Sequence, residues 1–269
     1  MSRDKEQGTL TSRKPAVLIA IDDGHGTETA GKRTPAFADG SVMRENTFNS
    51  QTAEYLKEAL ERCGFRVLMV APEDMDTPLK TRVVRANDAH ADAYISIHAN
   101  AYGSEWNSAN GVESIIYEKV MGHSQTYTFA QSIHDRLIEG TGRRDRGIKR
   151  SADLYVLKHT DMHAVLLECG FMTNREEAEL LKREDYRKKC AESICMGVCA
   201  FYKTEYIAPE KTAGERYDTE EELPQWAKPL LGEMAEKGCF GDPKKMDLSM
   251  DMIRTMVLLD RLRKKRESC

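Results

Sequence analysis

The chain is 269 residues long, which is enough for one α/β domain with a sizeable core and a small additional module. Hydrophobic residues make up 40% of the chain and charged residues 31%, a balance typical of globular proteins and not of disordered ones. The net charge of -4 argues against a nucleic-acid-binding protein, and no apolar run approaches the ~18–20 residues of a membrane span.

The N-terminal segment, residues 1–14, is polar and mixed in charge, so it is interpreted as a flexible leader. No apolar segment follows a basic start, and a secretory signal is therefore not readable. We expect a protein that is made in the cytoplasm and meets targets outside the membrane only after release through a pore or after cell lysis.

Residues 15–205 alternate between two patterns of apolar residues. Short apolar runs typical of buried strands occur at 17–21, 65–70, 93–97, 112–117, 154–157 and 164–167. Helical periodicity is found over 45–62, 81–89, 124–138, 176–181 and 185–202. This alternation predicts an α/β fold, with a largely parallel twisted sheet and helices on both of its faces.

The C-terminal part of the chain is predicted to be a separate small module. Residues 206–221 are interpreted as a linker, and residues 222–269 as a helical module in which Gly238 ends the first helix. Two short helices bury little apolar surface alone. We therefore expect the module to pack on the larger domain, on a second copy in a homodimer, or on a ligand.

The cysteines number seven and contain no CxxC pair, which favours reduced thiols over a disulfide framework. Cys190, Cys195 and Cys199 lie in one helical stretch, so metal ligands are one interpretation of them. Because Tyr186, Cys190, Ile194 and Val198 repeat every four residues, a buried helix face with small thiols is the favoured interpretation.

Four polar side chains stand where expected strands end or where a helix begins: His25, Glu45, His98 and Glu168. In open α/β sheets, ligands bind outside the carboxyl ends of the strands, so these side chains should converge there. Two histidines and one carboxylate form the ligand set of a catalytic zinc ion. A second carboxylate beside the metal supplies the general base that such a site needs.

The sequence resembles the type-3 family of zinc-dependent N-acetylmuramoyl-L-alanine amidases over about residues 15–203. Five segments match in the right order: Ile21–Gly26, Arg44–Asn49, Ser96–Ala101, Gly147–Lys149 and Val165–Asn174. The third is met letter for letter as Ser-Ile-His-Ala-Asn-Ala. Asp23 departs from the pattern by replacing the usual proline, as do His163 and Cys169 at other positions, but no ligand is lost.

This resemblance implies that His25, Glu45 and His98 hold Zn²⁺ and that Glu168 is the catalytic base. It implies cleavage of peptidoglycan between the lactyl group of N-acetylmuramic acid and L-alanine, by a lytic enzyme such as a phage endolysin. The start of the C-terminal module, Glu222–Ala227, is similar to tails behind phage and clostridial amidases. Neither nucleic acid nor stable membrane insertion is expected.

Two other function classes stay open on the sequence. One is another zinc hydrolase of the cell wall, a carboxypeptidase or sugar deacetylase, and the other is a wall-binding module with an idle metal site. The i, i+4 pair His159 and His163 lacks the glutamate of a zincin helix and is interpreted as structural. The basic runs Arg143–Arg146 and Arg261–Arg266 are interpreted as solvated faces, with anionic wall polymers as an alternative partner.

Overall fold

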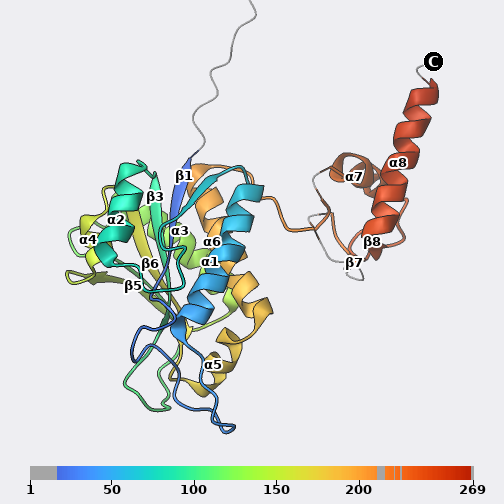
Figure 1. Cartoon of the computed structure of the whole chain (residues 1–269). Helices are drawn as coiled ribbons and strands as arrows, with labels where there is room; N and C mark the ends of the chain where they lie inside the picture. The colour runs from blue at the N-terminus through green and yellow to red at the C-terminus, as the bar shows by residue number, and fades with distance from the viewer. Residues whose placement is uncertain (1–16, 211–215, 221, 225, 268–269) are drawn as a thin grey trace, which may run out of the picture. The chain divides into compact units, whose positions relative to one another are not determined.

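Figure 1 shows the computed structural model, which describes residues 17–210, 216–220, 222–224 and 226–267. The predicted leader, residues 1–14, lies outside the described residues. The chain divides into two compact units, Met1–Lys203 and Thr204–Cys269, which are described here one at a time. No helix in the described part of the chain is long and apolar enough to cross a membrane.

The larger unit is built on a six-stranded sheet in the order β2-β1-β3-β6-β4-β5. Every neighbouring pair is parallel except β4 and β6, so the predicted fold class, a largely parallel sheet, is confirmed. The strands are β1 (Leu18–Asp23), β2 (Arg66–Met69), β3 (Ala93–Asn100), β4 (Val112–Tyr117), β5 (Asp145–Ser151) and β6 (His163–Phe171).

Helices cover both faces of this sheet (Figure 1). One face carries α1 (Glu45–Arg62), α3 (Gln125–Thr141) and α6 (Glu184–Tyr202), and α5 (Arg175–Leu181) leads from β6 to α6. The other face carries α2 (Leu79–Asp88) and α4 (Tyr155–His159), whose apolar side chains share one core cluster with alternate residues of the central strands. Because the central strands are buried on both sides, their sequences are almost continuously apolar.

The predicted strand at 154–157 is wrong, because Tyr155–His159 forms the short helix α4. Its run of apolar residues is too short for periodicity to separate a strand from a buried helical turn. The structure also adds a strand that the sequence did not predict, β5, in and after the basic run Arg143–Arg146. β5 is a partly exposed edge strand, so its residues are mostly polar and lack an apolar pattern.

The small unit contains α7 (Lys228–Glu236), α8 (Met250–Glu267) and a two-stranded antiparallel sheet of β7 (Arg216–Tyr217) and β8 (Leu248–Ser249). It is therefore not purely helical, and β7 lies inside the predicted linker 206–221. The unit has an apolar cluster of its own, to which both strands contribute. The cluster comprises Tyr217, Leu223, Ala227, Leu231, Met246, Leu248, Met250, Ile253 and Val257.

Candidate metal centre

His25, Glu45 and His98 come together at the carboxyl ends of β1 and β3. His25 follows β1, Glu45 is the first residue of α1, and His98 lies near the end of β3. One ligand atom from each side chain lies within 4.8 Å of the other two, and the group formed in this way does not include Glu168. The sequence therefore identified three side chains that the folded chain does gather into one place.

Glu45 lies between the two histidines. Its Oε1 atom is 2.9 Å from His98 Nδ1, and its Oε2 atom is 3.4 Å from His25 Nε2. Lys32 Nζ is 3.8 Å from the same carboxylate, which is only 2% exposed. Burial by itself raises the pKa of Glu45. The neighbouring histidines and Lys32 together lower it by more, so the carboxyl pKa is below its ordinary value.

The histidines have different proton affinities. Burial lowers the pKa of His25 to about 4, so its imidazole is neutral near pH 7 and has a free electron pair. Burial also disfavours protonation of His98, but the hydrogen bond and charge of Glu45 raise the His98 pKa on balance. Neutral imidazole is the form that binds a metal ion.

A chain of hydrogen bonds orients the His98 ring from the side opposite Glu45. Ser96 Oγ donates to Asp22 Oδ2 at 2.7 Å and lies 3.1 Å from His98 Nε2. Since the Ser96 hydroxyl proton is committed to Asp22, its oxygen accepts from Nε2–H, and Nδ1 is left with its electron pair toward Glu45. Two electron-rich atoms 2.9 Å apart require a shared proton or a cation between them, and this donor set fits Zn²⁺.

Glu168 lies beside His98 on the neighbouring strand, at the paired position of the β3–β6 register. Its Oε2 atom is buried and has no hydrogen-bond partner in the structure. Burial raises the pKa of Glu168 to about 8. A cation at the adjacent ligand group would lower this pKa, and the unpaired oxygen is free to exchange a proton with a bound water.

Two cavities flank the ligand group. One of about 280 Å³ is lined by Lys32, Glu45, His98, Asn100 and Glu168 among others. The other, of about 480 Å³, is more apolar and lies on the side of α2 and α4, with His25, His98, Thr77, Pro78 and Tyr155 in its wall. The proposed metal ligands are therefore reachable from space large enough for part of a substrate.

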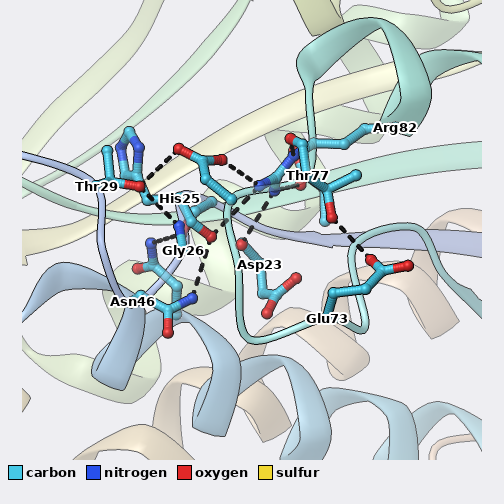
Figure 2. Close-up of polar contacts among 12 residues, drawn as sticks. Asp23, His25, Gly26, Thr29, Asn46, Glu73, Thr77 and Arg82 are labelled. Atoms are coloured by element: carbon cyan, nitrogen blue, oxygen red, sulfur yellow. Dashed lines mark hydrogen bonds and ion pairs between the residues drawn. The ribbon is translucent and has the colours of Figure 1, made fainter.

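Arg82 of α2 holds the loop that presents His25, a role that was not predicted from the sequence (Figure 2). Its guanidinium donates to Asp22 Oδ1 at 2.5 Å, to His25 O at 3.3 Å and to Asp76 Oδ1 at 2.9 Å. Arg82 is 1% exposed, so this ion pair with Asp22 is buried. The sequence carries no signal for this role, because an arginine on an amphipathic helix is normally exposed.

Two asparagines of α1 hold the same loop from its other side. Asn49 Nδ2 donates to Gly24 O at 2.7 Å, and Asn46 Nδ2 donates to His25 O at 3.1 Å. A Cβ atom on Gly24 would lie 2.0 Å from the His98 ring, so this position accepts only glycine. His25 itself has a positive φ of 67°, an unfavourable conformation for a residue with a side chain that these contacts hold in place.

Comparison with known proteins finds a matching family model and several similar proteins. A family model described as N-acetylmuramoyl-L-alanine amidase matches residues 19–200. The N-acetylmuramoyl-L-alanine amidase LytC of Bacillus subtilis is 34% identical over 185 residues, which are 69% of this chain and 35% of LytC. The chain thus spans about a third of that relative.

The endolysin of Bacillus phage SPP1 is 31% identical over 215 residues, and the match covers 78% of this chain and 73% of the endolysin. Among solved structures, an N-acetylmuramoyl-L-alanine amidase from Clostridium difficile 630 is similar, with a TM-score of 0.64 and 30% identity. That match covers 71% of this chain and 98% of the solved one.

Proposed function

Because this chain belongs to the N-acetylmuramoyl-L-alanine amidase family, we propose that it hydrolyses the peptidoglycan amide bond between the lactyl group of N-acetylmuramic acid and L-alanine. The observation that supports this most directly is the convergence of His25, Glu45 and His98 within 4.8 Å, beside the unpaired carboxylate oxygen of Glu168. Amide hydrolysis needs an activated water and a proton shuttle, and this group can provide both.

In the proposed site, His25, Glu45 and His98 hold Zn²⁺. When bound, zinc would polarise the scissile carbonyl and lower the pKa of a water in its open position. The chain orients the ligands for this: Ser96 and Asp22 fix the His98 tautomer, while Arg82 and Asn46 fix the His25 backbone. These outer contacts matter because they set the ring orientation before any ligand binds.

Glu168 is the proposed catalytic base. It accepts a proton from the attacking water as the carbonyl carbon is attacked, and it then delivers that proton to the departing L-alanine nitrogen. The position next to His98 on β6 and the absence of a competing hydrogen bond at Oε2 support this role.

The reaction is tested by incubating purified peptidoglycan with the full-length protein and identifying the products by mass. We expect stem peptides with a new free N-terminal L-alanine and glycan strands without peptide, and we expect a chelator to stop their release. Release of a C-terminal amino acid would indicate a carboxypeptidase, and release of acetate a sugar deacetylase. Binding without any product would indicate a wall-binding module with an idle metal site.

A lytic role as a phage endolysin is part of the proposal. It is supported by the similarity to the SPP1 endolysin, which extends over more of this chain than the similarity to LytC does, 78% against 69%. An endolysin expressed in a bacterial cytoplasm should leave cells intact until the membrane is permeabilised and should then lyse them rapidly. Lysis of intact cells without permeabilisation would contradict the proposed route to the wall.

A homodimer through the small unit is also proposed. Helix α8 exposes Leu258, Leu259 and Leu262, each at least 51% accessible, which leaves an apolar surface that a second copy could cover. Sedimentation of the full-length protein should then show a dimer that Leu259→Ser weakens. A monomer at all concentrations would remove dimerisation from the proposal.

A further inference from the structure

Three cysteines from two helices form a buried cluster at the α1–α6 contact. Cys63 is the C-terminal cap of α1, and Cys195 and Cys199 lie one turn apart on α6. Cys195 Sγ is 3.7 Å from Cys63 Sγ and 4.0 Å from Cys199 Sγ, and all three sulfurs lie within 4.8 Å of one another. Each residue is at most 5% exposed.

The spacing of these sulfurs is that of ligands around one ion. With a metal–sulfur distance of about 2.3 Å, sulfurs around a common centre lie roughly 3.8–4.0 Å apart at tetrahedral or trigonal angles. A disulfide would instead need two sulfurs at about 2.05 Å. We propose that Cys63, Cys195 and Cys199 form a second metal site, which binds a thiophilic d¹⁰ metal ion through three sulfurs.

The helices favour a cation at this place. Cys63 caps the C-terminal end of α1, and Cys199 lies in the last turn of α6, so the negative ends of both helix dipoles are close to the cluster. Soft thiolates select soft metal ions over Mg²⁺ or Ca²⁺. Without an ion, hydrogen bonds with the Cys199 and Cys63 thiols, together with burial, raise the pKa of Cys195 and keep it a protonated, unreactive thiol.

The site is separate from the proposed catalytic centre. Glu45 begins α1 and Cys63 caps its other end, and a helix of 18 residues is about 27 Å long. A metal ion at the cluster would therefore join α1 to α6 without contacting substrate. Its effect would be to stabilise the fold, since an ion that binds only the native state shifts the unfolding equilibrium toward it.

Cys190 provides a matched control within the same helix. It is fully buried on α6, as Cys195 is, but its thiol is hydrogen-bonded to that of Cys169 instead of lying in the cluster. A variant at Cys190 therefore removes a buried thiol of α6 and leaves the three proposed ligands in place.

The test uses Cd²⁺ as the probe, on full-length protein kept reduced with a phosphine. The background carries Cys239→Ser and Cys269→Ser, which remove the exposed thiol and the terminal one. We expect a near-ultraviolet thiolate-to-cadmium absorption band whose final intensity corresponds to one ion bound at the cluster, and a rise in Tm. A histidine–carboxylate site gives no such band, so binding at the proposed catalytic centre does not interfere.

Cys195→Ala should abolish the band and reduce the rise in Tm to the part that comes from Cd²⁺ at the proposed catalytic centre, and Cys190→Ala should preserve both the band and the full rise. Circular dichroism shows whether each variant is folded, and Cys63→Ser replaces Cys195→Ala if the latter is not. The proposal is overturned if folded background protein gives no band, if the band survives in a folded cluster variant, or if Cys190→Ala removes it equally. A Cys63–Cys195 disulfide found by mass in protein purified without reductant would overturn it as well.

Discussion

His98 is held from two sides, by Glu45 at Nδ1 and by Ser96 at Nε2. A histidine without such contacts can rotate and change tautomer, and it then binds metal less well. The buried pair of Ser96 and Asp22 therefore matters as much for the site as the ring itself. This explains why a serine with 0% exposure stands two residues before the histidine on a central strand.

His98→Ala should lower zinc occupancy and amidase activity together, because it removes one of three proposed protein ligands. Metal analysis of the purified variant checks the first effect, and turnover on peptidoglycan the second. His123→Ala, at an exposed position in the chain, should change neither. Full zinc content in the His98 variant would remove this residue from the ligand set.

Glu168→Gln should separate metal binding from chemistry. Glutamine keeps the shape of the side chain but cannot accept the proton, so zinc content and fold should persist while kcat falls by about 10²–10⁴-fold. Both quantities are measured on the same sample, with Glu118→Gln, an exposed position, as the control. Undiminished turnover would exclude the base role, and loss of zinc would make Glu168 a fourth ligand.

At the scale of elements, α2 contributes to the site although it carries none of the proposed ligands. Its residue Arg82 reaches Asp22 at the end of β1 and the backbone of His25, and so fixes the first loop of the sheet to the loop before α2. Loss of this buried ion pair should therefore disturb both the packing of α2 and the position of His25.

Arg82→Met should destabilise the protein strongly, because it leaves Asp22 buried and charged without its partner. Breaking one partner of a buried pair costs about 3–5 kcal/mol of unfolding free energy. Chemical denaturation measures this cost. Arg85→Met, on the same helix, breaks a surface pair with Glu73 and one hydrogen bond to Val70 O, and it should cost much less than Arg82→Met. Equal losses of unfolding free energy in the two variants would show that the buried Arg82 pair stabilises the protein no more than a surface pair does.

At the scale of the whole molecule, the two units have separate apolar cores. All proposed site residues lie before Lys203, and the cluster of the small unit is made only of residues 217–257. Among the described residues, the apolar cluster of the small unit is thus built from its own residues.

A chain ending at Ala208 should still fold and should still hydrolyse small muropeptides. It should act less well on intact cell walls if the small unit binds the wall or dimerises the enzyme. Thermal unfolding and turnover on both substrates check these expectations. A truncated chain that fails to fold would show that the small unit completes the catalytic fold.

The sequence by itself determined the fold class and the bounds of α1 and β4, and it pointed to the four polar residues that are proposed for the site. Hydrophobic periodicity and short motifs are local properties, and a polar residue at the end of an apolar strand points to the sheet edge wherever the strand pairs. The predictions failed where the local pattern was ambiguous. A run of four apolar residues was predicted as a strand but lies largely in helix α4, and the polar edge strand β5 has no apolar pattern to detect.

Only the tertiary structure decided which distant residues meet. Arg82 pairs with Asp22 across 60 positions, and Cys63 approaches Cys195 across 132. The sequence grouped Cys195 with Cys190 and Cys199, because all three lie on one helix, whereas packing places Cys195 and Cys199 beside Cys63 of another helix. Such contacts depend on strand register and on how α1 and α6 pack against the sheet, and these are properties of the whole chain that no local pattern encodes.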